Sequence, residues 1–407
     1  MTVPNSEFFT VGGAGVPITH PDRMVFGDIG VTKLDLMDYY CAVADAALRG
    51  VRDRPMILKR FVKGIQQEAV FQKRAPAKRP DFVDVAELKY ASGTSAKEAV
   101  LRDAAGLIWA VNLGCVDLNP HPVRADDLDH PDELRVDLDP MPGVGWPQII
   151  DVAFIVREVL SDHGLVSWPK TSGSRGFHIY ARIHRHWPFT SVRLAAEALA
   201  REVEHRAPES ATARWWKEER HGVFVDFNQN AKDRTVASAY SVRATPDARV
   251  STPLFWDEVA DCRPEEFTIA TVPQRFERLG DPWEGMDDAA GGLGSLLDLA
   301  DRLGPAEKAP RGARRSAMPL IEIARTKTRD EALAALQQWR DKYPAAASAL
   351  KPADVLVDGM RGPSSIWYRV RINLQHVATD ARPPQQTLLA DYSPWATRSR
   401  SRRRREG

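Results

Sequence analysis

Apolar residues recur along this chain at two spacings, one typical of helices and one typical of strands. The helical spacing, in which apolar residues return every three or four positions, predicts helices over 34–49, 146–162, 190–206 and 328–342. Short alternating or continuous apolar runs predict strands over 55–62, 134–140, 165–169, 176–183, 222–227, 236–243 and 366–377. Helices and strands follow one another without a regular strand–helix–strand rhythm and without an internal repeat. This order favours an α+β fold, or an irregular α/β fold.

Polar residues at segment ends refine two of the helix predictions. Thr32 is a suitable N-cap for the helix over 34–49, and Gly50 can end it. Ser95 and Glu98 have the spacing of a capping box, so a further helix is expected to run through Leu107.

Changes in composition along the chain predict its domain organisation. Glycines gather in residues 1–19, which are expected to lack regular structure, and 287–317 is rich in Gly, Ala and Arg, as linkers often are. We therefore expect a first domain over 1–286 and a small C-terminal extension over 318–395. The arginine-rich residues 396–407 are predicted to form a disordered basic tail.

Overall composition is that of a globular protein. The 407 residues are 43% hydrophobic and 27% charged, with a net charge of +1. The three cysteines are far apart, which argues against a disulfide framework or a zinc ribbon. No signal peptide and no apolar stretch long enough to cross a bilayer is recognised, so a cytoplasmic location without membrane contact is expected.

A pair of acids at the end of a predicted strand is the first candidate for chemistry. Asp137 and Asp139 are one residue apart, so both project from the same face of the strand, and Pro140 ends it. Neighbouring carboxylates repel one another unless a cation or a proton relieves them. Two divalent cations held in this way can activate a hydroxyl and stabilise a leaving oxygen. A solvated strand end is the alternative, because short Asp-x-Asp motifs are common.

A third acid, Asp226, is embedded in the apolar run 223–227. Burial of an unpaired carboxylate is costly, so this side chain is expected either to pair with an arginine or to bind a metal. Its position in a second apolar strand favours a metal site shared with Asp137 and Asp139.

A turn over 172–176 offers a candidate site for an anion. Its glycines allow the backbone to close on a phosphate, and it carries hydroxyls, including that of Ser172, and the guanidinium of Arg175. Lys170 and His178 flank the turn, which a plain hairpin turn would not explain. The sequence is not a P-loop, because no Gly-x-x-x-x-Gly-Lys-Ser/Thr occurs.

Basic and aromatic residues elsewhere are weaker candidates. Lys59 lies in a predicted strand and Arg243 at the end of another. Phe71 with Lys73 combines an aromatic ring and a positive charge, which suits stacking on a base, although Phe71 could equally belong to the core.

These residues lie in segments that resemble the polymerase domain of the bacterial non-homologous end-joining ligase, a member of the archaeo-eukaryotic primase superfamily. The matching segments include, in order, Thr32-Lys33-Leu34-Asp35, Phe71-Gln72-Lys73, Asp137-Leu138-Asp139-Pro140, Lys170-Thr171-Ser172-Gly173, Gly176-Phe177-His178, Val225-Asp226-Phe227 and Tyr240-Ser241-Val242-Arg243-Ala244. The resemblance extends from about His20 to Trp283. It implies an α+β primase-polymerase fold with a mixed central sheet flanked by helices, and leaves 318–395 as an α/β extension.

Placed residue by residue, the resemblance implies a set of roles. The acids that it implies for two Mn²⁺ or Mg²⁺ ions are Asp137, Asp139 and Asp226. The residues implied for the nucleotide are Ser172, Arg175, His178, Gln229 and Arg243, to which we add Lys59. Arg175 stands where the family more often has lysine. The residues expected to contact DNA are Lys33, near the 5′-phosphate of a downstream strand, Phe71 and Lys73.

The resemblance implies a DNA-dependent polymerase that adds NTPs, with ribonucleotides preferred, to a primer 3′-hydroxyl during gap filling or end extension. Implied partners are DNA with gaps or ends bearing a 5′-phosphate, NTP or dNTP, a separate ATP-dependent DNA ligase and an end-binding protein, in association with the nucleoid. No Lys-x-Asp-Gly motif of an adenylating ligase is present.

Two departures from the family pattern and three alternatives stay open. Asn119 stands where the family commonly has histidine, and Val70-Phe71 keeps one aromatic where it often has two. The alternatives are a non-catalytic DNA-end-binding module, a metal-dependent phosphatase or nuclease that uses the same aspartates, and de novo priming instead of extension.

Overall fold

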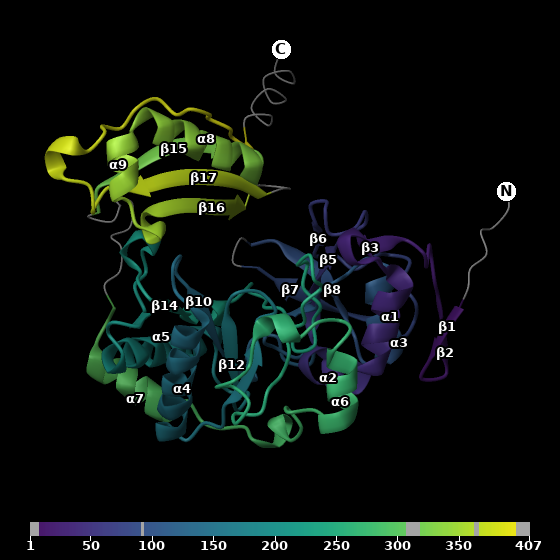
Figure 1. The fold of residues 1–407 in the computed structure, drawn as a ribbon. Helices are drawn as coiled ribbons and strands as arrows, with labels where there is room; N and C mark the ends of the chain where they lie inside the picture. Colours follow the sequence, from purple (N-terminus) through teal and green to yellow (C-terminus); the bar gives the residue numbers. More distant parts are fainter. Residues whose placement is uncertain (1–7, 91–92, 307–317, 362–365, 396–407) are drawn as a thin grey trace, which may run out of the picture. The chain divides into compact units, whose positions relative to one another are not determined.

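The computed structural model of the chain describes residues 8–90, 93–306, 318–361 and 366–395 (Figure 1). These residues form two compact units. The first contains the chain up to Pro140, then Val144–Ala213 and Gly222–Ala306. The second contains the described residues from 318 onward together with two short segments, Met141–Gly143 and Arg214–His221.

A mixed five-stranded sheet forms one half of the first unit. Its strands are ordered β11 (Trp168–Thr171), β12 (Phe177–Arg182), β10 (Glu133–Pro140), β14 (Val223–Asp226) and β13 (Ala211–Thr212). Neighbouring strands are antiparallel except β13 and β14, which are parallel. The helices that cover this sheet are α4 (Trp146–Asp162) and α5 (Phe189–Arg206), and α7 (Gly294–Leu303) packs on α5 (Figure 1). Strand β10 therefore lies at the centre of the sheet.

A second sheet with its own helices forms the other half of the first unit. Its strands are β6 (Val70–Gln72), β5 (Pro55–Arg60), β8 (Ser95–Val100) and β7 (Asp84–Lys89), and β9 (Asn119–Pro120) pairs with β5. The helices beside it are α1 (Lys33–Ala42), α2 (Ala44–Val51) and α3 (Ala104–Asn112). Two hairpins precede α1, formed by β1 (Phe8–Val11) with β2 (Ala14–Pro17) and by β3 (Met24–Phe26) with β4 (Val31–Thr32). The short helix α6 (Val272–Leu279) completes the unit. One core of buried apolar side chains runs through both halves.

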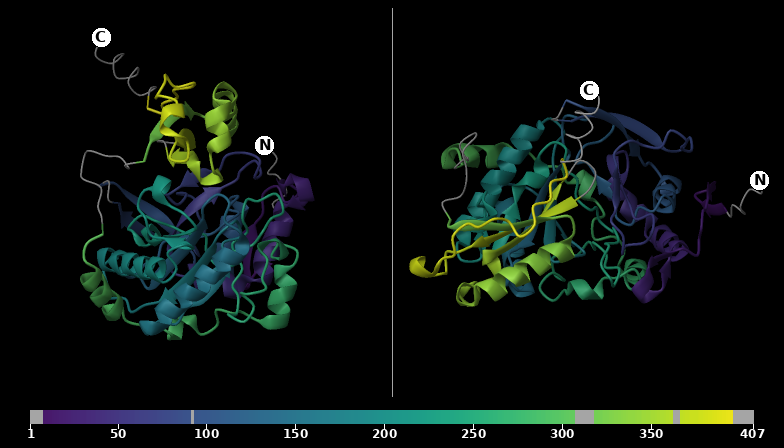
Figure 2. Two further views of the ribbon diagram at one scale, coloured as in Figure 1. Left: turned by 60° about the vertical axis from the view of Figure 1, so that its left-hand side comes forward. Right: turned by 90° about the horizontal axis from the view of Figure 1, so that it is seen from above.

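The second unit is a small three-stranded antiparallel sheet with a helix on one face. The strands are ordered β15 (Leu320–Thr326), β17 (Ile366–Asn373) and β16 (Val355–Arg361). Helix α8 (Arg329–Lys342) packs on the sheet and α9 (Pro344–Ala349) packs on α8 (Figure 2). Leu336 and Trp339 of α8 meet Val370 and Ile372 of β17 in a separate core.

Most predicted helices are confirmed, with one change. The spacing of apolar residues placed α4 and α8 correctly, and Thr328 caps α8. Thr32 caps α1 through a capping box with Asp35, but the predicted helix over 34–49 is divided at Val43 into α1 and α2.

The helix expected to start at Ser95 is wrong, because residues 95–100 form strand β8. Glu98 is fully buried in that strand and lies 3.0 Å from His121 Nε2 through its Oε2 atom. A buried acid with a distant partner is a tertiary feature that local spacing does not reveal. The helix begins at Ala104 instead, capped by Asp103, whose carboxylate accepts a hydrogen bond from the Gly106 N–H.

Two segments predicted to be irregular and one predicted strand also differ from the structure. Residues 8–17 form a hairpin, and part of the expected linker forms helix α7. Residues 236–243 are not a strand: the backbone of Tyr240 has a positive φ of 60°, and Val242 makes only an isolated bridge with Val250. Residues 307–317 and the tail 396–407 lie outside the described residues. None of the described helices combines the length and the apolar character that crossing a bilayer requires.

Candidate active site

Three adjacent strands bring a histidine and two aspartates into one row. In the register of the sheet, Asp137 of β10 lies opposite His178 of β12 on one side and opposite Asp226 of β14 on the other. Residues directly opposite one another in an antiparallel pair project from the same face. Asp139 projects from that face too, because it follows Asp137 by two positions.

The three predicted metal ligands therefore form a cluster. One carboxylate oxygen from each of Asp137, Asp139 and Asp226 lies within 4.8 Å of the other two. Burial, followed by the charge of Asp226, raises the pKa of Asp137 to about 7. Three acids so close together repel one another, and hard divalent cations that prefer oxygen ligands relieve such repulsion. The donor set thus fits Mg²⁺ or Mn²⁺.

The amide of Gln229 links two of these acids. Its Nε2 atom donates to Asp226 Oδ2 at 3.0 Å and to Asp137 Oδ2 at 3.3 Å. The N–H of Asn228 donates to the other oxygen of Asp226 at 2.8 Å. The side chain of Gln229 thus lies on the carboxylates, and its position near an incoming nucleotide stays a prediction.

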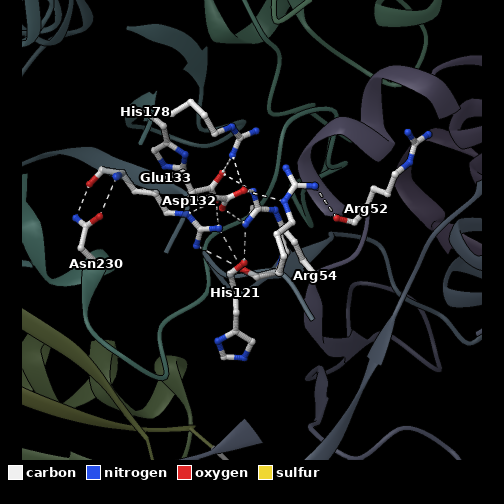
Figure 3. A network of polar contacts seen from close by, with 12 residues as sticks. Arg52, Arg54, His121, Asp132, Glu133, His178 and Asn230 are labelled. Carbon is white, nitrogen blue, oxygen red and sulfur yellow. Dashed lines mark hydrogen bonds and ion pairs between the residues drawn. The ribbon is translucent and has the colours of Figure 1, made fainter. Parts of the chain in front are cut away.

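A 3₁₀ turn (Phe227–Asn230) that follows β14 carries Gln229, and Asn230 fixes this turn to β10. The Asn230 side chain accepts from the Arg135 N–H at 2.8 Å and donates to the Arg135 carbonyl at 2.7 Å, as Figure 3 shows. Both atoms of one amide thus complete backbone hydrogen bonds of the central strand. The acids and Gln229 are positioned by sheet pairing and by this bidentate contact.

His178 connects Asp137 to a buried lysine. Its Nε2 atom lies 3.1 Å from Asp137 Oδ1, and its Nδ1 atom lies 2.6 Å from Lys170 Nζ. Burial and the adjacent Lys170 charge hold the pKa of His178 well below its usual range, so the ring is neutral. Lys170 also donates to Ser251 Oγ at 2.6 Å and to the Ala237 carbonyl at 3.0 Å. Lys170 and Asp137 therefore fix the orientation of the imidazole ring through its two nitrogen atoms.

The turn over 172–176 is folded tightly beside the acids. The Ser172 hydroxyl oxygen accepts from the N–H groups of Ser174 and Gly176, at 3.1 and 3.0 Å. A Cβ atom on Gly176 would come within 2.5 Å of the Leu138 carbonyl oxygen, next to Asp139. This close approach explains the glycine. The hydroxyl of Ser172 thus shapes the turn, and its predicted contact with a phosphate stays a prediction.

Arg175 extends from this turn into solvent. The residue is exposed, and within the described parts of the chain its side chain makes no ion pair or hydrogen bond. A guanidinium beside an acidic metal site, with its donors available, suits an anionic oxygen of a triphosphate.

Lys59 and Arg243 meet at a buried acid that the sequence did not single out. Lys59 Nζ lies 2.8 Å from Asp117 Oδ2, and Arg243 Nε lies 4.0 Å from the same oxygen. The Asp117 side chain is 1% exposed. Arg243 also borders the turn, since its Cγ atom lies 2.5 Å from the position that a Cβ on Gly173 would take. Asp117 therefore joins β5 of the second sheet to the segment that carries Arg243 beside the turn.

Two of the predicted DNA-contacting residues, Phe71 and Lys73, lie in or directly after β6, a strand of the second sheet. Phe71 is 46% exposed and lies opposite Lys59 in the β5–β6 pair. Lys73 Nζ lies 3.5 Å from the centre of the Tyr90 ring.

Lys33 is buried at the start of α1, where it contacts Thr19 and donates to Asn112 Oδ1 at 2.8 Å. Burial, and then the charge of Arg23, lowers the pKa of Lys33 to about 8. Its present contacts tie an N-terminal segment to α3.

A buried ion network anchors the other end of β10 (Figure 3). Arg54 is fully buried, 2.6 Å from Asp132 Oδ1 and 3.3 Å from Glu133 Oε2. Arg182 of β12 lies 3.0 Å from the same Glu133 oxygen. Burial alone would raise the pKa of Asp132, but Arg54 and other arginines hold it below its usual range. The network fixes the strand that carries Asp137 and Asp139.

One family of known proteins is similar to this chain in both sequence and structure. The family model "LigD, primase-polymerase domain" matches residues 32–283. The LigD protein of Mycobacterium tuberculosis H37Rv is 32% identical over 305 residues, which are 71% of this chain and 38% of that protein. LigD of Pseudomonas aeruginosa is 31% identical over 275 residues, covering 66% of this chain and 32% of the relative. LigD of Mycolicibacterium smegmatis is 30% identical over 269 residues, covering 65% and 35%.

Among solved structures, the polymerase domain of M. tuberculosis Ligase D in complex with DNA superposes with a TM-score of 0.64 at 30% identity. The match covers 68% of this chain and 99% of that domain. The three curated relatives are multifunctional proteins, and the matched region spans 32–38% of their length.

Proposed function

The chain belongs to the LigD primase-polymerase domain family, and from this premise we propose that it is a metal-dependent polymerase that adds nucleotides to the 3′-hydroxyl of a DNA primer. Homology to LigD polymerase domains supports a nucleotidyltransferase. The observation that carries the proposal is the cluster of Asp137, Asp139 and Asp226 beside the turn that bears Arg175. We further propose that the reaction fills gaps or extends ends during double-strand break repair, with ribonucleotides preferred.

Asp137, Asp139 and Asp226 would hold two Mg²⁺ or Mn²⁺ ions. When bound, such ions activate the attacking hydroxyl and stabilise the leaving oxygen. The protein supplies the geometry. Because the acids come from paired strands, their spacing is set by backbone hydrogen bonds before any substrate binds, which is the preorganisation that phosphoryl and nucleotidyl transfer require.

Residues of the turn and its surroundings would bind the triphosphate. Arg175 would neutralise charge that develops on the pyrophosphate. Neutral His178, whose Nε2 now faces Asp137 Oδ1, would donate from that atom to a phosphate oxygen once cations hold the carboxylate. The Gln229 amide, which now spans Asp137 and Asp226, would release these oxygens as cations bind. Each of these roles lowers the energy of charge that accumulates during the reaction, without a covalent intermediate.

The partner set follows from the same premise. DNA with a gap or an end carrying a 5′-phosphate would be the substrate, with Phe71 and Lys73 contacting it. We propose that a separate ATP-dependent DNA ligase would seal the product and that an end-binding protein would recruit both enzymes.

Primer extension tests the proposal. The chain is incubated with Mn²⁺, a gapped duplex bearing a 5′-phosphate, and either NTPs or dNTPs. We expect template-directed incorporation, faster with NTPs. Release of mononucleotides from DNA without added NTP would favour a nuclease, and DNA binding without incorporation would favour a non-catalytic end-binding module.

A further inference from the structure

The C-terminal sheet has one apolar face and one polar face. Val370 and Ile372 of β17 join the core beneath α8. Side chains alternate along a strand, so Arg369 and Arg371 project from the opposite face. Arg325 of β15 lies directly opposite Arg369 in the register. Three guanidinium groups therefore gather on the face that α8 does not cover.

A cavity of about 850 Å³ lies within the second unit on this polar face. Its lining includes all three arginines. Trp216 and Glu218, from the segment Arg214–His221 of the same unit, line it as well, and so does the stretch 385–388. The cavity thus combines guanidinium groups with a half-buried indole ring.

Two of the three arginines are already paired. Arg371 lies 3.2 Å from Glu218 Oε2 and 2.9 Å from Asp358 Oδ2. Arg325 lies 2.7 Å from Glu322 Oε1 and 3.3 Å from Asp391 Oδ1. These contacts occupy the acids that border the cavity.

Arg369 differs from its neighbours. Its buried Nε atom has no hydrogen-bond partner, and its side chain makes no ion pair or hydrogen bond within the parts of the chain that the structure describes. An arginine keeps its charge at any physiological pH. A half-buried guanidinium flanked by two others is stabilised when an anion binds it.

The aromatic residues indicate which anion. Trp215, next to Trp216, is 47% exposed, and the two follow Arg214 and precede Lys217. Adjacent indole rings beside a single unpaired cation match the repeating unit of a nucleic-acid strand, in which flat bases alternate with phosphates. A polyacidic peptide offers no flat group for the rings to stack on.

We propose that the polar face of the C-terminal sheet binds single-stranded nucleic acid, with a phosphate on Arg369 and a base stacked on Trp216. The inference deepens the proposed function in one respect, since it assumes that the substrate of the protein is nucleic acid. It gives the extension a role in holding an unpaired strand, such as the overhang of a broken end.

Fluorescence anisotropy with a labelled 15-nucleotide oligothymidylate tests this site in the full chain. The buffer contains EDTA and no nucleotide, so the result does not depend on catalysis. We expect Arg369→Ala to weaken binding about tenfold and Trp216→Ala to do the same, as loss of a stacked base does elsewhere. The slope of log K against log salt should fall by about 0.7 for Arg369→Ala, the value for one phosphate of a single strand.

Arg340→Ala is the matched control, because Arg340 is exposed on α8, the helix that packs on the sheet. It should bind as the wild type does. Trp216→Phe, which keeps a ring, should retain most of the affinity and guards against misfolding of the Trp216→Ala variant. Equal affinity of Arg369→Ala and Arg340→Ala would overturn the proposal. So would Arg369-dependent binding of polyglutamate without binding of the oligonucleotide. Arg369-dependent strand binding by a chain that incorporates no nucleotide would instead overturn the polymerase assignment alone.

Discussion

At the scale of single residues, the site is governed by the repulsion among three acids. In the metal-free chain this repulsion is relieved in two ways: Asp137 has a pKa raised to about 7, and Gln229 donates to both Asp137 and Asp226. When cations bind, Asp137 must lose its proton and Gln229 must release the carboxylate oxygens. Metal affinity should therefore depend on pH and on Gln229.

The pKa of Asp137 predicts how metal affinity changes with pH. Its raised pKa means that the folded, metal-free chain holds a proton that the unfolded chain loses near pH 4. Between about pH 4 and 7 this group thus makes the metal-free protein less stable as pH rises, and Mn²⁺ must displace the proton. Affinity should rise up to about pH 7 and then level off. Calorimetric titration with Mn²⁺ from pH 5.5 to 8.5 measures this, and an affinity that stays flat across the range would contradict the prediction.

Removal of the Gln229 amide should destabilise the metal-free site. Gln229→Ala leaves Asp137 and Asp226 facing one another without a donor, which should lower the free energy of unfolding by about 1 kcal/mol in EDTA at pH 8. Saturating Mn²⁺ should abolish the difference, because cations replace the donor. Thermal unfolding with and without Mn²⁺ measures this, with Gln337→Ala on the exposed surface of α8 as the control. A deficit that persists in Mn²⁺ would show that Gln229 acts only on the fold.

The sequence predicted some of these residues and missed others for physical reasons. Asp226 was recognisable because a carboxylate in an apolar strand needs a partner. Asp117 was not, since its importance arises from the pairing of β5 with β9, which brings Lys59 near it. The hydrogen bonds that the Ser172 hydroxyl accepts from the turn backbone were not predictable, because they depend on the exact path of the turn, and its contact with a phosphate stays a prediction.

At the scale of elements, the candidate site is formed by β10, which carries Asp137 and Asp139, and by the turn over 172–176 beside it. The long helices were predictable because their apolar stripe is a local signal, as for α4 and α8. Strand β8 was wrongly predicted to be a helix because Ser95 and Glu98 have the spacing of a capping box. The Glu98 side chain instead lies beside His121, which is distant in the sequence.

The turn over 172–176 packs tightly against β10, so a side chain at Gly176 should disturb both. In Gly176→Ala the new Cβ would come within 2.5 Å of a backbone oxygen of β10, which cannot move without disturbing Asp139. We expect a loss of about 1–3 kcal/mol in unfolding free energy and a marked loss of incorporation. Gly292→Ala, which meets no atom within 4 Å, is the control and should change neither quantity. If Gly176→Ala kept the unfolding free energy and the nucleotide incorporation of the wild type, the turn would not be rigidly packed against β10.

At the scale of the whole molecule, the two compact units are interleaved in the sequence. The segment Arg214–His221 belongs to the C-terminal unit, although it precedes the strand that carries Asp226. Within that unit Lys217 pairs with Asp358, and buried Glu218 pairs with Arg371. Composition alone indicated a single boundary between the two units, so the contribution of this segment to the C-terminal unit was not predicted.

The buried Glu218–Arg371 pair predicts the stability of the C-terminal unit. Arg371→Ala leaves the carboxylate of Glu218, 3% exposed, without its ion pair, which should lower the stability of this unit by about 3 kcal/mol. Arg340→Ala, at an exposed site, should change little. Urea unfolding followed by tryptophan fluorescence and hydrogen exchange of residues 320–373 measures the effect. Unchanged exchange in β15–β17 would contradict it.

The central claim is that Asp137, Asp139 and Asp226 share a pair of cations at which a nucleotide reacts. Anomalous diffraction from crystals grown with Mn²⁺, a gapped DNA duplex and a non-hydrolysable NTP tests it most directly. The account predicts two manganese peaks roughly 3.5–4 Å apart, bound by these three carboxylates and by the triphosphate. Manganese bound elsewhere, with the three acids free of metal in the presence of nucleotide, would contradict it.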